Sequence, residues 1–147
     1  MSWRGTAGGI QAAQTGNDVI MSPSTYFYFD YWQTYSHDNE PLAFKRTLPM
    51  QKVYSFNPFD GLAADQEKSI IGIQANLWTE YIPTSEQLEY MLLPRMSALS
   101  EVQWCQPENK NLDRFKASLN HTFKIYDAMG LTYCRDVIGQ YGMPESK

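Results

Sequence analysis

The sequence of 147 residues lacks the features that mark several large classes of protein. Lys and Arg total 12 against 16 Asp and Glu, so the formal charge of −4 provides no basic field for a phosphate backbone, and we expect no nucleic-acid partner. No apolar run approaches the roughly 20 residues of a membrane-spanning helix, and no charged-then-apolar leader opens the chain. We therefore expect no membrane partner. A GxSxG elbow and a glycine-rich phosphate loop are also absent.

Cysteine and histidine are scarce, with two of each. Cys105 and Cys134 occur in no CxxC or Cys/His spacing, and His37 and His121 are isolated, so we expect neither a bound metal nor another cofactor. A disulfide would require the segments after two separate helices to meet. Two buried thiols are the favoured alternative.

Aromatic side chains are abundant, with seven Phe, four Trp and ten Tyr, and 43% of the residues are hydrophobic. This apolar content is enough for a packed core in one domain or in a piece of a larger one. The aromatic residues exceed what such a core needs. We therefore expect some of them to line a surface or cleft, which suits sugars and flat ligands.

Hydrophobic periodicity and turn residues predict the order helix, strand, helix, strand, helix, helix. This order is typical of an α/β fold with parallel strands. Two or three strands cannot close a barrel of eight, so the sheet is either small and open or part of a larger one. The expected elements are a short helix ending at Gly16, a strand at 19–21, a helix within 41–54, a strand at 69–80, a helix capped by Thr84 and kinked at Pro94, and a last helix from 112 that Gly130 ends.

The second predicted strand alternates in character. Ile71, Ile73, Ala75 and Leu77 share one parity, and Gln74, Asn76, Trp78 and Glu80 share the other. Alternation of this kind predicts one apolar face and one polar face, and we expect the functional side chains on the polar face.

An aromatic residue and a carboxylate stand two residues apart after each strand, as Tyr28 with Asp30 and as Trp78 with Glu80. In an extended chain this spacing points both side chains to the same side. An aromatic face can stack on a sugar ring, and a carboxylate can accept hydrogen bonds from its hydroxyls. The alternative is that the aromatic rings pack in the core or at its rim and the carboxylates are solvated loop residues. Taken without any family, Asp30 and Glu80 are also candidates for a general acid and base of glycoside hydrolysis.

Longer stretches resemble the end of the catalytic barrel of family twenty glycoside hydrolases, the β-N-acetylhexosaminidases. They are residues 72–80 (GIQANLWTE) and 89–104 (EYMLLPRMSALSEVQW), preceded by 2–5 (SWRG), 18–23 (DVIMSP) and 28–30 (YFD). The resemblance covers nearly the whole chain. It implies about strands six to eight of a TIM (β/α)8 barrel with their helices over residues 1–130, followed by a tail over 131–147.

The resemblance also implies roles for five residues. Trp3 and Trp78 correspond to walls around the N-acetyl group of the substrate, and Tyr28 to the residue that hydrogen-bonds its carbonyl oxygen. Asp30 and Glu80 correspond to carboxylates that bind outer hydroxyls of the terminal sugar. They are then substrate ligands and not the acid and base.

The adjacent Asp-Glu pair that performs proton transfer in this family is absent, because no Asp is followed by Glu anywhere in the chain. No catalytic residue is therefore assigned. We expect the pair on earlier strands upstream of Met1, and we expect this chain alone to be inactive. The resemblance implies a fragment of a retaining exo-β-N-acetylhexosaminidase acting on oligosaccharides that end in N-acetylhexosamine. The alternative is a non-catalytic carbohydrate-binding or assembly module.

Three further residues have structural interpretations. We expect Arg95 to pair with a carboxylate, and Trp32 and Trp104 to anchor the packing between sheet and helices. Unpaired strand edges of a partial barrel predict self-association of the isolated chain.

Overall fold

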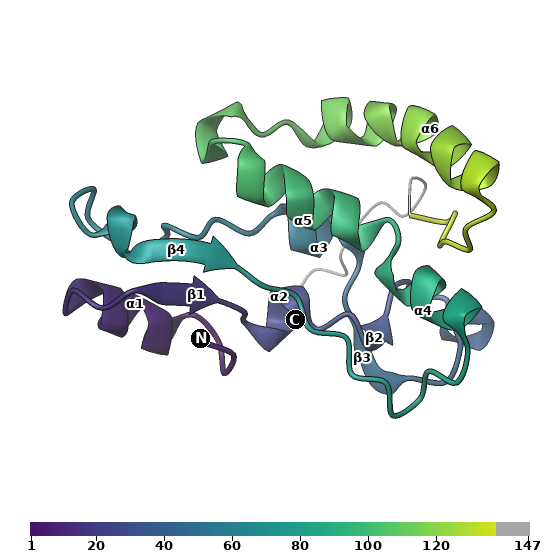
Figure 1. Ribbon diagram of the computed structural model, residues 1–147, viewed down its shortest axis with the longest axis horizontal. Helices are drawn as coiled ribbons and strands as arrows, with labels where there is room; N and C mark the ends of the chain where they lie inside the picture. Colours follow the sequence, from purple (N-terminus) through teal and green to yellow (C-terminus); the bar gives the residue numbers. More distant parts are fainter. Residues whose placement is uncertain (138–147) are drawn as a thin grey trace.

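A computed structural model describes residues 1–137 of the chain (Figure 1). The last ten residues of the predicted 131–147 tail lie outside the described residues. The helices are α1 (Ala7–Gln14), α2 (Ser24–Phe27), α3 (Met50–Tyr54), α4 (Ser85–Leu92), α5 (Arg95–Trp104) and α6 (Leu112–Met129), with short 3-10 turns η1 (His37–Asn39), η2 (Glu67–Ser69) and η3 (Pro107–Asn109). The strands are β1 (Val19–Met21), β2 (Tyr31–Trp32), β3 (Phe44–Thr47) and β4 (Ile70–Ile73).

The strands form two parallel pairs, β1 with β4 and β2 with β3. Met21 lies opposite Ile73 in the first pair. Isolated parallel bridges extend this pair, from Ser2 to Met21 on one side and from Tyr28 to Asn76 beyond the strand ends. The expected α/β class with parallel strands is confirmed.

Helices lie beside both strands of the β1–β4 pair. In Figure 1, α1 lies along β1, and α5 and α6 lie beyond β4. The close approach of α1 depends on Gly9, since a Cβ at this position would stand 2.5 Å from the sulfur of Met21. Side chains from strands and helices then form one core that includes Met21, Phe27 and Phe29.

The expected helix ends occur where the sequence places them. Thr84 caps α4, with its hydroxyl oxygen accepting from the backbone N–H of Gln87 at 3.2 Å. Pro94 separates α4 from α5, so the predicted kink is a complete break between two helices. Gly130 ends α6 in the left-handed conformation, at φ 68°.

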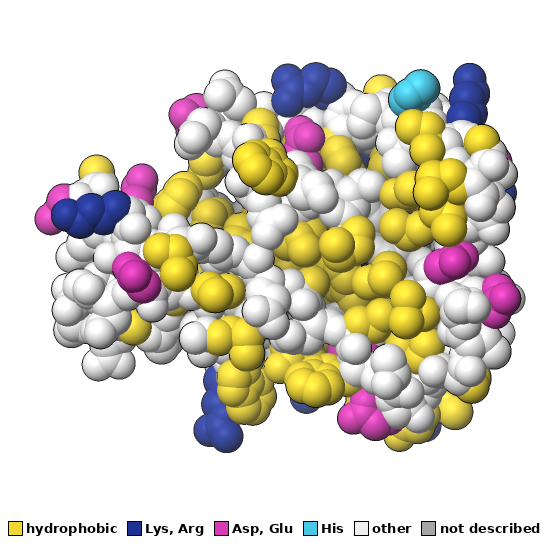
Figure 2. Space-filling view, viewed as in Figure 1, with side chains coloured by type: hydrophobic (Ala, Val, Ile, Leu, Met, Phe, Trp, Pro, Cys, Tyr) yellow, Lys and Arg dark blue, Asp and Glu magenta, His cyan; other side chains and the backbone are white. Residues whose placement is uncertain are grey.

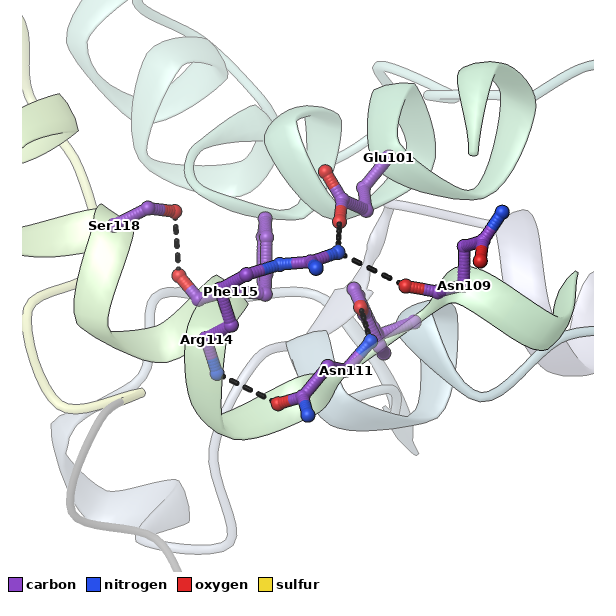
Figure 3. Close-up of polar contacts among 7 residues, drawn as sticks. Glu101, Asn109, Asn111, Arg114, Phe115 and Ser118 are labelled. Atoms are coloured by element: carbon purple, nitrogen blue, oxygen red, sulfur yellow. Dashed lines mark hydrogen bonds and ion pairs between the residues drawn. The ribbon is translucent and has the colours of Figure 1, made fainter. Parts of the chain in front are cut away.

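The start of α6 is fixed against α5 (Figure 3). The side-chain oxygen of Asn111 accepts from the backbone N–H of Arg114 at 2.9 Å. The Arg114 guanidinium lies 3.7 Å from a carboxylate oxygen of Glu101 on α5 and donates to the carbonyl of Asn109. The Asn111 side chain thus caps the start of α6, and an exposed ion pair joins its first turn to α5.

Two predicted elements are wrong in part. The segment 41–54 is helical only from Met50, because Phe44–Thr47 forms β3 instead. Pro49 has an extended ψ of 155°, and its ring disfavours helix in the residue before it, which fits a short strand followed by a short helix. The predicted strand 69–80 ends at Ile73 and continues as irregular chain with one bridge at Asn76.

Burial also departs from the expected alternation. Ile71 is 60% exposed although Ile73, on the same parity, is buried. Trp104 is 89% exposed and is not a packing anchor, whereas Trp32 is half-buried, stacks on His37 and donates to the carbonyl of Pro41 at 2.9 Å. Figure 2 shows hydrophobic side chains gathered over the middle of one face, with Lys and Arg side chains at its margins.

Both cysteines are free thiols, Cys134 buried and Cys105 half-buried. The disulfide alternative is therefore wrong for this structure. No helix in the described part of the chain is long and apolar enough to cross a membrane.

Candidate functional site

A hollow of about 770 Å³ opens beyond the end of the β1–β4 pair. All five residues that the resemblance implies as substrate ligands lie on it, although they come from three separate segments. Its lining consists of Trp3, Ser24, Tyr28, Asp30, Tyr31, Phe44, Lys45, Arg46, Trp78 and Glu80.

Backbone hydrogen bonds beyond the strand ends bring two of these segments together. The N–H of Phe29 donates to the carbonyl of Asn76 at 2.7 Å, and the N–H of Asn76 donates to the carbonyl of Phe27 at 2.8 Å. The ring centroids of Tyr28 and Trp78 consequently lie 6.5 Å apart, at an angle of 58°. The aromatic residues after β1 and β4 therefore form adjoining parts of one wall.

Trp3 joins the hollow through the chain start. The N–H of Ser2 donates to the carbonyl of Ile20 at 2.9 Å, and the N–H of Ser24 donates to the carbonyl of Trp3 at 3.0 Å. The Trp3 ring carries the Arg4 guanidinium at 4.9 Å on one face. Trp3 and Trp78 are 45% and 51% exposed, so both rings have surface left for a ligand.

The two carboxylates of the hollow differ in environment. Asp30 is 4% exposed, and its Oδ1 atom has no hydrogen-bond partner among the described residues, whereas Glu80 is exposed. Burial raises the pKa of Asp30 above its ordinary value, although the backbone N–H groups of Asp30 and Trp78 and the charge of Arg95 act in the opposite direction. An unpartnered, buried carboxylate oxygen at a cavity wall is suited to accept hydrogen bonds from ligand hydroxyls.

Arg95 fixes the loop that carries Asp30. Its side chain is fully buried, and its Nη1 atom donates to the carbonyl of Tyr31 at 3.0 Å, while Nη2 donates to the carbonyl of Phe29 at 2.5 Å. The guanidinium also donates to the carbonyls of Leu48 and Met91. The expected ion pair with a carboxylate is therefore wrong, since carbonyl oxygens on both sides of Asp30 accept these hydrogen bonds instead.

Five lining residues escaped the sequence interpretation: Ser24, Tyr31, Phe44, Lys45 and Arg46. Tyr31 directly follows Asp30, and its ring lies 6.0 Å from that of Tyr28. The other three bulky residues belong to β3, a segment that the sequence assigned to a helix. Only the pairing of β3 with β2 places them at the hollow.

The described residues contain no group of three or more His, Cys, Asp or Glu side chains that could hold a metal ion. The hollow therefore presents aromatic walls, two carboxylates and two basic side chains. Such a surface can stack on a sugar ring and accept hydrogen bonds from its hydroxyls.

Comparison with known proteins identifies a family for this arrangement. The family model described as glycosyl hydrolase family 20, catalytic domain, matches residues 1–107. A β-hexosaminidase of Porphyromonas gingivalis is 39% identical over 135 residues, and a β-N-acetylhexosaminidase of Cellulomonas fimi is 30% identical over 125 residues. These matches cover 90% and 84% of this chain but only 17% and 25% of the relatives.

Solved structures agree with the sequence matches. The exo-β-N-acetylglucosaminidase of Vibrio harveyi in complex with N-acetylglucosamine superposes with a TM-score of 0.83 at 29% identity, over 91% of this chain and 21% of that chain. A β-hexosaminidase of Streptomyces plicatus in complex with N-acetylglucosamine gives a TM-score of 0.78 at 26% identity, over 93% and 27%. The chain therefore belongs to glycosyl hydrolase family 20 and corresponds to part of its catalytic domain.

Proposed function

We propose that this chain is the part of a family 20 catalytic barrel that holds the terminal sugar of an oligosaccharide, and that the complete enzyme is a retaining exo-β-N-acetylhexosaminidase. In this proposal the described elements belong to about strands six to eight, with barrel residues 1–130 and a tail at 131–147. The observation that carries it is the convergence of Trp3, Tyr28, Asp30, Trp78 and Glu80 on one hollow.

Each of these side chains has a role that its environment supports. The exposed faces of Trp3 and Trp78 enclose the acetamido group, and the hydroxyl of Tyr28 donates to its carbonyl oxygen. The free Oδ1 of Asp30 and the exposed carboxylate of Glu80 accept hydrogen bonds from sugar hydroxyls. The complexes of the Vibrio and Streptomyces relatives with N-acetylglucosamine support this ligand class.

The reaction proposed for the complete enzyme is substrate-assisted. The acetamido oxygen attacks the anomeric carbon while the glycosidic bond breaks and a general acid protonates the leaving oxygen. Water then opens the oxazolinium ion, and the configuration is retained. The walls around the acetamido group hold its oxygen in line for attack, where misplacement by about 1 Å can cost roughly 10²-fold in rate.

The absence of an Asp-Glu pair from the chain favours a second candidate, a carbohydrate-binding or assembly module without hydrolysis. The two candidates predict different hydrolytic activity once an Asp-Glu pair is supplied. We expect no hydrolysis of a chromogenic N-acetylglucosaminide by the 147-residue chain at any pH. We expect hydrolysis when the chain is expressed with an in-frame upstream segment that contains an Asp-Glu pair. Binding without hydrolysis in both forms would support the module instead.

Binding by the chain itself provides the direct test. Calorimetric titration should show that N-acetylglucosamine binds in preference to glucose, which lacks the acetamido group. Trp78→Ala should weaken this binding, whereas Trp104→Ala, at an exposed tryptophan outside the hollow, is the matched control. Equal affinity for the two sugars, or equal effects of the two substitutions, would contradict the proposed role of the hollow.

A further inference from the structure

The backbone ladder between β1 and β4 is interrupted just before the hollow. The N–H of Gln74 donates to the carbonyl of Met21 at 2.9 Å, and further along the chain the N–H of Asn76 donates to the carbonyl of Phe27 at 2.8 Å. Only Ala75 separates Gln74 from Asn76, whereas the chain from Met21 to Phe27 leaves the ladder and forms α2. The backbone pairing therefore has a gap at the base of α2.

A side-chain hydrogen bond spans this gap. The Nδ2 atom of Asn76 donates to the hydroxyl oxygen of Ser22 at 2.8 Å. The Nε2 atom of Gln74 donates to Oδ1 of Asn76 at 3.0 Å, so the amide oxygen is engaged on that side and the amide nitrogen faces Ser22. Ser22 is 0% exposed, and a hydrogen bond shielded from water in this way is stronger than one at the surface.

Ser22 also joins the segment that begins the chain. Its backbone N–H donates to the carbonyl of Ser2 at 2.9 Å, and Trp3 directly follows Ser2. Trp78 lies on the same segment as Asn76, which holds the hydroxyl of Ser22. The segments that carry the two tryptophans are thus tied to one buried serine.

These contacts point to a role in ligand binding for two residues that do not line the hollow. We infer that Ser22 and Asn76 are positioning residues, and that their hydrogen bond sets the width of the enclosure formed by Trp3, Tyr28 and Trp78 around the acetamido group. A gap of roughly 0.5–1 Å between packed atoms already forfeits a quarter to a half of their attraction, so a small widening weakens the enclosure. The inference rests on the proposed function, which supplies the acetamido ligand.

Selectivity for the acetamido group separates this role from a general loss of structure. Calorimetric titration of the 147-residue chain with N-acetylglucosamine and with glucose gives the ratio of their two affinities. The loop of Asp30, which is proposed to bind hydroxyls that both sugars have, is held separately by Arg95. Loss of the Ser22–Asn76 hydrogen bond should therefore weaken the binding of N-acetylglucosamine more than the binding of glucose.

The single variants Asn76→Ala and Ser22→Ala should each lower this affinity ratio by about three- to tenfold, the range expected for loss of one net hydrogen bond. Asn57→Ala is the matched control, because it removes an amide hydrogen bond of 2.7 Å to Asp60 from a position outside the hollow. This control should leave the ratio as it is in the unmodified chain. Ser22→Ala removes a single oxygen atom, so it supplies the measurement if Asn76→Ala does not fold.

The double variant Ser22→Ala with Asn76→Ala provides a second criterion. Both substitutions remove the same hydrogen bond, so together they should lower the ratio no further than the stronger single variant does. Additive falls, an equal loss of affinity for both sugars, or an equal fall with Asn57→Ala would overturn the inference. A preference for N-acetylglucosamine that survives both single substitutions overturns the inference alone, whereas a ratio of one in the unmodified chain overturns the proposed function and the inference with it.

Discussion

Replacement of Arg95 by Met tests how the Asp30 loop is held. The guanidinium is fully buried and donates five hydrogen bonds to the carbonyls of Phe29, Tyr31, Leu48 and Met91. Replacing the guanidinium leaves these four buried carbonyls without their hydrogen-bond donor. At about 1 kcal/mol or more for each unsatisfied carbonyl, the free energy of unfolding falls by more than ~4 kcal/mol.

Part of this loss is recovered, because the variant no longer buries a charge. We therefore expect Arg95→Met to lower the free energy of unfolding by about 2–4 kcal/mol. Urea unfolding followed by circular dichroism measures this change. Arg95→Lys should fall between the variant and the unmodified chain, because one ammonium group cannot reach four carbonyls in the planar geometry of a guanidinium.

Arg114→Met provides the matched control. Arg114 is exposed and makes a single ion pair at 3.7 Å, so its loss should change the free energy of unfolding by less than about 1 kcal/mol. Equal destabilisation by Arg95→Met and Arg114→Met would refute the claim that Arg95 holds the loop. A variant too unstable to fold would agree with the large loss, and Arg95→Lys would then supply the measurable value.

Four further predictions concern packing, titration, binding and assembly. Gly9→Ala should destabilise the chain by about 1–3 kcal/mol in urea, because its methyl group would clash with Met21, whereas Gly8→Ala has its nearest neighbour at 3.8 Å and should be neutral or stabilising. Asp30→Asn should stabilise the chain at pH 7, because burial raises the pKa of Asp30 and its ionised form therefore opposes folding. This gain in the free energy of unfolding should disappear as the pH falls through the raised pKa toward 3.8, where the carboxyl group is protonated, and urea unfolding of both proteins at pH 7 and near pH 4 tests the sign. In the complete enzyme, Glu80→Gln should cost on the order of 1–3 kcal/mol in kcat/KM while both limbs of the pH profile remain, and loss of one limb would instead make Glu80 a proton-transfer residue. Sedimentation should show concentration-dependent association of the isolated chain, since β4 pairs only with β1 in the described residues and Ile71 is 60% exposed; a strictly monomeric species would contradict this.

Local chemistry made several parts of this fold predictable. Thr84 and Asn111 cap helices with their own side chains, and Gly130 ends a helix because it accepts a positive φ without strain. These signals act within a few residues, so no tertiary partner is needed to interpret them. The apolar run Val19–Met21 was also predicted correctly as a parallel strand.

The spacing of aromatic and carboxylate residues predicted the candidate site for a related reason. Tyr28 with Asp30 and Trp78 with Glu80 are local patterns, and parallel strands bring their following segments to the same end of a sheet. The family resemblance added Trp3 and the assignment of each role. Those roles stay predictions until the binding measurements are made.

Long-range contacts decided what the sequence alone did not. Phe44–Thr47 is a strand because it pairs with β2, and that pairing carries Lys45 and Arg46 to the hollow. Arg95 is buried because carbonyls from residues far away in the sequence converge on it, whereas Trp104 is exposed because no described element packs over it. Local sequence determined the cap of α4 and both ends of α6, since those preferences depend on near neighbours. Burial and charge pairing were decided by the tertiary structure, because they depend on which distant segments meet.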